Sequence, residues 1–507
     1  MPSYTTASRL ALAAALLTGT AAAADVTAED VWANWQEQMG LSSLGGVTIG
    51  SETYANGVLT VTNLGFSSSD GEVEVSGRLD EITFTENGDG TVSVSMSETY
   101  PLAIRPEGSN SDGIEMSLVT TGMDITASGD PGAITYDIAY DRQGLQIDSL
   151  VIDGEEIETS GGLFVNDVTG SYTVSTADAV VFDYEFKAAS VDLDFELIAP
   201  EDEGFIRLNG DIADLALSAS GSIPQELMEA SQTGVEPDPA VIAKMAVDLA
   251  YSVGPATYSF EADIDGDMGQ GNLSVEGAGV AFIFNKDSFG LLGGAQGLDL
   301  SFSGFGIPLP IDVQMEEYFY GFAMPLSASE EPREFGLRAG IRELQVNDII
   351  WGIVDPMGQI PHDPVTVTFE LGGTAMLDVD LLSPEGQMQA AMSDDFPGTL
   401  GTLTVTNTLV EAAGARLAAE GAFEFDNSDT TTLDGVPFPV GELVVTAEGI
   451  NALMDSLVAM GLLPQDQVMG ARMMMGMFAV PTGDDALESR IETRSGGELW
   501  VNGNRLQ

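Results

Sequence analysis

A two-residue alternation of apolar and polar side chains recurs along this 507-residue sequence and limits the folds that it can adopt. Between residues 191 and 197, for example, every second residue is Val, Leu or Phe, and the residues between them are Asp or Glu. Side chains of a β-strand alternate between the two faces of a sheet, so this pattern predicts strands with one apolar and one charged face. Turns such as Asn-Gly-Asp-Gly at residues 87–90 separate the strands, which is typical of antiparallel hairpins.

Glycines inside the alternating segments predict bends in the strands. Four of them follow apolar residues at the same two-residue spacing: Gly77, Gly210, Gly277 and Gly421. A glycine within a strand often marks a bulge or bend that curves a sheet. The pentapeptide Leu-Thr-Val-Thr-Asn also occurs twice, at residues 59–63 and 403–407. Such self-similarity fits either an internal duplication or a chance likeness among strands.

Helical periodicity is confined to a few short regions. A capping-box sequence begins at Thr27, and Val31, Trp32 and Trp35 follow it at helical spacing. Further short helices are expected at residues 224–228, 239–249, 450–460 and 465–478. We therefore predict a mainly β protein with long, curved antiparallel sheets that bend at glycines, a short N-terminal helix and a C-terminal helical pair packed on the sheet.

The helices suggest how the chain is divided. Residues 1–24 are expected to be a signal peptide, and residues 25–221 an N-terminal β-rich lobe. Residues 222–250 are expected to be a helical connector, and residues 251–507 a C-terminal β-rich lobe that includes the helices at 450–478. A chain of this length fits two or three domains, although long β-architectures can run as one.

The charge balance is strongly acidic and excludes some partners. The sequence has 80 acidic and 16 basic residues, a formal net charge of −64. Binding to a phosphate backbone requires clustered cations, so nucleic acid is excluded as a partner, and anionic lipid headgroups would repel most of the surface. With 44% hydrophobic residues, the chain is too apolar to be disordered. The absence of cysteine excludes disulfides and thiolate chemistry.

The N-terminus has the three parts of a secretory signal. Arg9 supplies the positive charge, residues 10–17 form an apolar run, and Ala22 to Ala24 offer small side chains to a signal peptidase. Cleavage after Ala24 would leave a periplasmic or secreted protein. An uncleaved membrane anchor is the alternative, but the run is shorter than the roughly 20 residues of a spanning helix. No later segment is long and apolar enough to span a bilayer.

No catalytic motif is apparent. His362 is the single histidine, which excludes two-histidine metal motifs. It lies in a proline-bracketed segment and is read as a turn residue rather than a general base, because no nucleophile motif accompanies it. Phosphate-binding loops and dinucleotide fingerprints are also missing. A glycosidase needs only two carboxylates, so a carbohydrate-active enzyme stays open as an unfavoured alternative.

Calcium is the one metal for which the sequence offers ligands. Asp263, Asp265 and Asp267 place hard oxygen atoms around Gly266. The glycine comes too early for an EF-hand loop, and the distal Glu is out of register. These carboxylates are therefore either a weak calcium site or simply solvated, and no other cofactor is expected.

Methionines gather near the C-terminus. Seven of the 21 lie between Met454 and Met477. Flexible thioether side chains suit an irregular core, an adaptable apolar groove or a Cu(I) site. The residues expected to line a groove are Met454, Leu457, Met469, Met473 and Met477.

Several segments resemble a known family. They are residues 31–35, 355–364, 453–464, 471–478 and 501–506. Together they resemble exported alphaproteobacterial proteins of the uncharacterised family named domain of unknown function 2125. This resemblance implies no known activity and supplies no catalytic residue, and the chain has His362 where Arg would be expected in the family. At the level of fold, the curved strands are also similar to AsmA-like envelope proteins, whose β-grooves are associated with lipid handling.

These observations favour a non-enzymatic envelope protein whose curved sheet holds a lipid or another apolar ligand. The first alternative is a structural or protein-binding β-protein of the periplasm. The second is a carbohydrate-active enzyme, which the low aromatic content of 7% makes the poorest fit.

Overall fold

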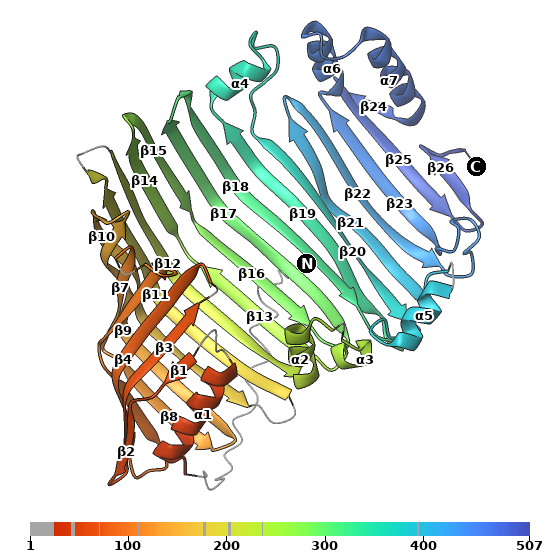
Figure 1. Cartoon of the computed structure of the whole chain (residues 1–507). Helices are drawn as coiled ribbons and strands as arrows, with labels where there is room; N and C mark the ends of the chain where they lie inside the picture. Colours follow the sequence, from red (N-terminus) through yellow and green to blue (C-terminus); the bar gives the residue numbers. More distant parts are fainter. Residues whose placement is uncertain are drawn as a thin grey trace.

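The computed structural model describes residues 25–41, 46–69, 71–109, 111–175, 179–200, 204–235, 237–392 and 395–506 (Figure 1). The signal peptide expected at residues 1–24 lies outside the described residues. Within them, 27 strands form one antiparallel sheet. The mainly β fold, the short N-terminal helix and the C-terminal helices are confirmed.

The N-terminal half of the sheet follows helix α1 (Ala28–Leu41). Its strands are β1 (Gly46–Thr48), β2 (Ser51–Ala55), β3 (Val58–Ser69), β4 (Val73–Glu86), β5 (Val92–Met96), β6 (Thr99–Pro106), β7 (Gly113–Thr121), β8 (Asp124–Asp130), β9 (Ala133–Ile152), β10 (Glu155–Ser175), β11 (Ala179–Ile198) and β12 (Gly204–Pro224).

Two helices, α2 (Gln225–Thr233) and α3 (Pro239–Ile242), precede the central strands. These strands are β13 (Ala246–Val253), β14 (Ala256–Ile264), β15 (Asp267–Val275), β16 (Gly277–Phe284), β17 (Ser288–Gly304), β18 (Ile307–Pro325) and β19 (Arg333–Val346). The remaining elements are α4 (Asp348–Val354), β20 (Val365–Leu377), α5 (Pro384–Met392), β21 (Gly398–Ala412), β22 (Ala415–Asp426), β23 (Phe438–Glu448), α6 (Ile450–Ala459), α7 (Gln465–Phe478), β24 (Val480–Gly483), β25 (Ala486–Arg494), β26 (Glu498–Val501) and β27 (Asn504–Arg505).

The helix expected at residues 239–249 is only partly present. It ends at Ile242, and β13 begins at Ala246. Residues 247–253 alternate with a period of two, and in the structure they pair with β12 on one side and β16 on the other. These residues therefore form a strand instead of the predicted helix, because they pair with strands on both sides. Because β12 and β13 also pair directly, the sheet continues past the helices, and the division into two lobes stays a prediction.

A transverse line of irregular backbone crosses the sheet. Six long strands carry a residue with left-handed backbone, near the middle in all but β19: Asn63, Asp167, Asp214, Gly297, Glu343 and Asn407. On either side of this line, one long strand often pairs with two shorter ones. β12 pairs with β13 and β14, for example, and β17 pairs with β15 and β16. Asn and Asp adopt left-handed backbone more readily than most residues, which explains their presence here.

The repeated pentapeptide marks this same line. Both copies of Leu-Thr-Val-Thr-Asn end on a left-handed residue, Asn63 in β3 and Asn407 in β21. Gly210, one of the glycines predicted to bend a strand, does not belong to this line. Gly210 has no left-handed backbone, and a side chain there would collide with the ring of Tyr258 on the adjacent strand. Its role is to make room for an aromatic ring, whereas Gly297 takes part in the transverse line.

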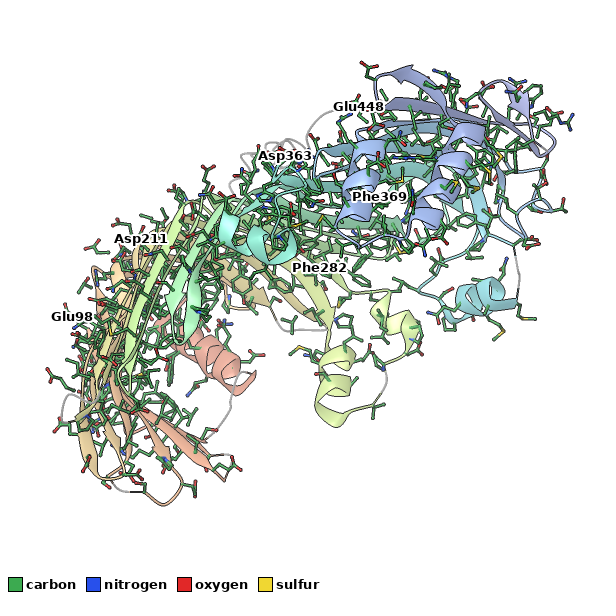
Figure 2. The ribbon with its side chains drawn as sticks, turned by 90° about the horizontal axis from the view of Figure 1, so that it is seen from above. Glu98, Asp211, Phe282, Asp363, Phe369 and Glu448 are labelled. Carbon is green, nitrogen blue, oxygen red and sulfur yellow. The ribbon has the colours of Figure 1, made fainter. Side chains whose placement is uncertain are left out.

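The sheet is a single curved layer over most of its length. Figure 2, seen from above, shows the strands as an arc with α1, α2, α3 and α5 on the inner side. The chain exposes 28755 Å² of surface, whereas a compact monomer of this mass would expose about 18,000 Å². Unlike most domains, in which two packed layers enclose a core, this protein leaves much of its sheet without a second layer.

The main hydrophobic core lies under α1. Thr27 and Asp30 form the expected reciprocal cap: Thr27 Oγ1 accepts from the Asp30 amide at 3.2 Å, and Asp30 Oδ2 accepts from the Thr27 amide at 3.0 Å. Trp32 and Trp35 then pack against Phe84 with ring centroids 5.7 and 5.4 Å away. The two tryptophans therefore seal the concave face at this end of the sheet.

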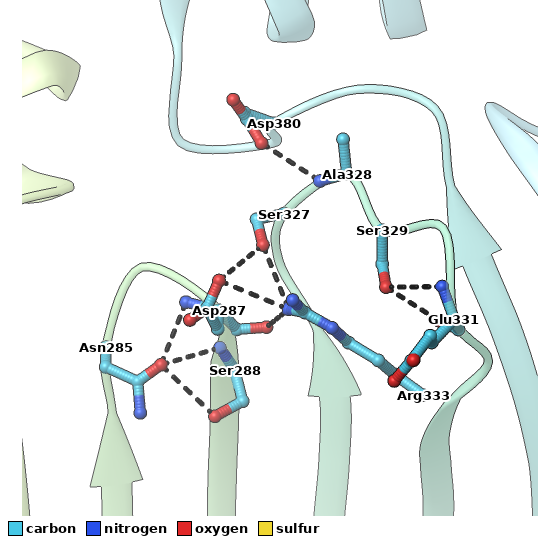
Figure 3. A network of polar contacts seen from close by, with 9 residues as sticks. All are labelled: Asn285, Asp287, Ser288, Ser327, Ala328, Ser329, Glu331, Arg333 and Asp380. Carbon is cyan, nitrogen blue, oxygen red and sulfur yellow. Dashed lines mark hydrogen bonds and ion pairs between the residues drawn. The ribbon is translucent and has the colours of Figure 1, made fainter.

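A polar network ties three loops together at one edge of the sheet (Figure 3). Asp287, in the turn between β16 and β17, accepts a hydrogen bond from the Ser327 hydroxyl at 2.7 Å. Arg333 Nη1 donates to the Asp287 carbonyl at 3.0 Å and to Ser327 at 2.9 Å. Asp380 accepts from the amide of Ala328 at 2.9 Å. The Ser327 hydroxyl, with help from Arg333, holds the pKa of Asp287 below its usual value.

Candidate ligand-binding surface

An uninterrupted row of apolar residues crosses the sheet from β9 to β26. Each residue of this apolar row is the direct cross-strand partner of the next: Tyr136, Tyr172, Tyr184, Ala219, Leu249, Phe282, Leu291, Phe322, Leu337, Leu371, Val405, Gly421, Leu443, Ile491 and Val501. Neighbouring strands lie about 4.8 Å apart, so the row is about 67 Å long. None of its 15 positions carries a charge or a strongly polar group other than the tyrosine hydroxyls.

A second apolar row lies across the transverse line from the first. Its members are Leu145, Leu163, Leu193, Gly210, Tyr258, Leu273, Leu300, Val313 and Val346. The residues next to them form a polar row: Gln146, Gly162, Asp194, Asn209, Ser259, Asn272, Ser301 and Asp312. The two faces of the sheet thus differ sharply in polarity.

Both apolar rows lie on the concave face. Figure 2 shows Phe282 and Phe369 on the inner side of the arc, and Glu98, Asp211 and Glu448 on the outer side. Phe282 belongs to the first row. Successive side chains of a strand point to opposite faces, so the neighbour of Asp211 in the second row faces inward as well.

The transverse line explains how both halves present apolar residues on one face. In the first part of β11, the apolar residues have even numbers, as at Tyr184 and Phe186. Beyond the line they have odd numbers, as at Val191 and Leu193. The change of parity falls beside the left-handed residues Asp167 and Asp214 of the adjacent strands. The change of parity is present in the sequence of β11, but only the strand register shows that it coincides with the transverse line.

Large apolar side chains of the concave face are open to solvent. Phe322 is 40% exposed, Leu337 42% and Phe369 39%. At the N-terminal end, by contrast, Tyr136 is fully buried beneath α1, where its hydroxyl donates to Asn34 Oδ1 at 2.8 Å. The face is therefore covered by α1 at one end and open over β18 to β20.

The aromatic residues next to α1 are uncharged. Tyr136 stacks on Tyr172 with ring centroids 4.7 Å apart, and Tyr172 stacks on Tyr184 at 5.8 Å. Burial raises the pKa of Tyr136 and of Tyr172 above the ordinary value. Their hydroxyls stay protonated at neutral pH, so this end of the row is neutral.

The five residues predicted to line a groove in the C-terminal helices do not share one surface. Met454 is 8% exposed and Leu457 is half-buried, so both belong to the packed side of α6. Met469, Met473 and Met477 lie on the exposed side of α7. The predicted groove residues that are open to solvent therefore lie on the outer face of α7.

The three aspartates considered for calcium lie in the turn between β14 and β15. Asp263 Oδ1 accepts a hydrogen bond from the amide of Gly266 at 2.9 Å, which stabilises the turn. Among the residues that the structure describes, no three His, Asp or Glu side chains converge as a metal site would require. The calcium site stays a prediction.

His362 is held within the segment that follows α4. Its ring stacks on Trp351 with centroids 4.8 Å apart and planes 5° from parallel. Its Nδ1 lies 3.4 Å from Asp348 and its Nε2 lies 3.8 Å from the buried Asp355. Asp355 also accepts from the amide of Ile360 at 2.9 Å. These contacts give His362 a role in closing the loop.

Comparison with protein-family models, with curated proteins and with solved structures found no match for the chain. The family resemblance stays a prediction. In the described part of the chain, no helix combines the length and apolar character needed to cross a bilayer.

Proposed function

We propose that this protein binds lipids or other elongated apolar ligands along the concave face of its sheet, as a non-enzymatic protein exported to the cell envelope. The observation that carries the proposal is the apolar row, which presents large side chains to solvent over β18 to β20. Soluble proteins rarely expose an apolar surface of this extent unless something binds there.

The dimensions of the face suit acyl chains. One leaflet of a bilayer core is about 15 Å thick, so a row of about 67 Å could take about four acyl chains end to end. The charged face of the same strands points outward, as Asp211 and Glu448 do in Figure 2. An apolar ligand on the concave face would remove hydrocarbon surface from water without desolvating these carboxylates.

A structural or protein-binding role in the periplasm is the alternative, because an apolar sheet face can also receive a protein. A carbohydrate-active enzyme would need paired carboxylates in a cleft. The apolar row has aromatic residues but no carboxylate, so this second alternative gains no support.

A pair of matched variants tests ligand binding. Leu337→Glu places a charge in the apolar row, while Ile283→Glu places one on the opposite face at a side chain that is similarly exposed, 39% against 42%. We expect Leu337→Glu to weaken binding of a pyrene-labelled fatty acid about tenfold or more, because the ligand would desolvate the carboxylate. Ile283→Glu should leave the affinity within about twofold. Equal losses in both variants, or no binding by the unaltered protein, would contradict the proposal.

A further inference from the structure

Helix α7 displays methionines on the side away from its packing partner. Met469, Met473 and Met477 are four residues apart, so they share one face of the helix. They are 66%, 66% and 60% exposed, whereas Val468 on the other side is buried. A helix that presents its apolar residues to solvent departs from the usual arrangement of an amphipathic helix on a core.

Polar contacts fix this orientation. Arg472 Nε donates to Asn451 Oδ1 at 2.9 Å, and its Nη2 donates to the Asn451 carbonyl at 3.1 Å and pairs with Asp455 at 2.8 Å. Asp485 in turn accepts from the amides of Asn451 and Ala452 at the start of α6. Turning α7 to bury its methionines would break the Arg472 contacts, so the outward methionine face is a built feature of the fold.

The exposed apolar surface continues around α7. Leu462 in the preceding loop, Met474 and Phe478 within the helix, and Val480 just after it are also exposed. Helix α4 lies at the same edge of the sheet (Figure 1), and Ile353 and Met357 are exposed there. Opposite this edge, the turns of β16–β17 and β18–β19 are closed by the polar network of Figure 3.

The charge of the C-terminal helices and of the whole chain indicates which kind of lipid surface α7 can contact. Residues 450–478 contain two carboxylates, Asp455 and Asp466, and one cation, Arg472, a net charge of −1. The whole chain has a net charge of −64, so an anionic lipid surface would repel the molecule. A surface of zwitterionic headgroups carries no net charge and accepts inserted apolar side chains, as at other amphipathic helices that lie in a membrane interface.

We propose that the outer face of α7, formed by Met469, Met473, Met477 and the neighbouring Phe478, docks the protein on a lipid surface of zwitterionic headgroups. The helix has 14 residues and is about 21 Å long, which is enough to lie along the interface. The methionines enter the headgroup region while Arg472 keeps α7 attached to α6. This docking surface is separate from the concave face and does not depend on ligand binding there.

Vesicle sedimentation tests the docking, with a matched control on another helix. The test variant is Met469→Gln, Met473→Gln and Met477→Gln combined; the control is Met388→Gln with Met392→Gln on α5, where the two side chains are 63% and 82% exposed. We expect the protein to sediment with phosphatidylcholine vesicles and to bind less when phosphatidylglycerol replaces part of the lipid. The α7 variant should lose binding about tenfold or more, because less apolar area enters the interface, and the α5 variant should bind as the unaltered protein does.

A second measurement uses the absence of cysteine in the sequence. A polarity-sensitive fluorophore on Met473→Cys should shift to the blue on addition of phosphatidylcholine vesicles, and the same fluorophore on Met388→Cys should not shift. Docking by α7 would be refuted if the α7 and α5 variants bound vesicles equally, or if neither fluorophore responded. Leu337→Glu should sediment normally, so a failure of ligand binding on the concave face can be told apart from a failure of docking.

Discussion

Asp485 caps the first turn of α6 and so helps to hold the C-terminal helices in place. Its Oδ1 accepts from the amide and the side-chain amide of Asn451 at 3.1 and 2.7 Å, and its Oδ2 accepts from the amide of Ala452 at 2.9 Å. It thus satisfies two of the donors that the first turn of α6 cannot satisfy itself. Loss of a helix cap costs about 0.5–2 kcal/mol. Because three hydrogen bonds are lost here, Asp485→Ala should cost about 2 kcal/mol locally.

Hydrogen–deuterium exchange of residues 450–478 measures this change in the free energy of local opening of α6 and α7. A loss of about 2 kcal/mol corresponds to roughly 30-fold faster exchange through local opening. Asp485→Asn keeps one side-chain acceptor and should give a smaller increase. Unchanged exchange in α6, or an equal increase over the whole sheet, would refute the cap.

The effect of Asp485 should also depend on pH. Burial by itself would raise the pKa of Asp485, but hydrogen bonds from Ala452 and Asn451 outweigh burial and leave the pKa below its ordinary value of 3.8. A carboxyl group with a lowered folded-state pKa stabilises the fold above its unfolded-state pKa, and this contribution is lost as the pH falls through the folded-state value. The difference between the protein and Asp485→Ala should therefore be full at neutral pH and shrink below about pH 4.

Two further predictions concern packing on the sheet. Gly210→Val would push a side chain into the Tyr258 ring and should lower the free energy of unfolding by about 1–3 kcal/mol. The control, Gly470→Ala in α7, has open space around it and should be neutral or slightly stabilising. Denaturant unfolding of both variants measures the difference, and equal midpoints would contradict the close packing at Gly210. Tyr136→Phe removes the hydrogen bond to Asn34 while keeping the ring, so the free energy of unfolding should fall by about 1 kcal/mol. An unchanged free energy of unfolding would mean that this hydrogen bond contributes no net stability.

The sequence predicted the strands well because one alternating pattern encodes them locally. Residues 191–197 lie in β11, and α7 has the predicted bounds of 465–478. The predicted helix at residues 239–249 is wrong beyond Ile242, where α3 ends, and β13 begins to pair with β12 at Ala246. Helical and strand patterns are hard to distinguish over so few residues, and here pairing with strands distant in sequence determines the secondary structure.

The candidate surface was less predictable than the strands. Alternation shows which residues share a face, but it does not show whether another layer covers that face. Tyr136 and Phe322 belong to the same apolar row, yet one is fully buried under α1 and the other is open to solvent. Methionine content indicated α6 and α7, but only the structure distinguishes Met454, which is buried, from Met473, which is 66% exposed. The transverse line joins strands far apart in the sequence, and it became visible only with the register.

Native mass spectrometry of the protein purified from the cells that produce it, with organic extraction alongside, tests the central claim most directly. The account predicts added masses that match lipids in the extract, lost when Leu337→Glu places a charge in the apolar row and retained in Ile283→Glu. A protein that carries no apolar ligand in repeated detergent-free preparations, with an extract free of lipid, would contradict ligand binding on the concave face and favour a structural or protein-binding role.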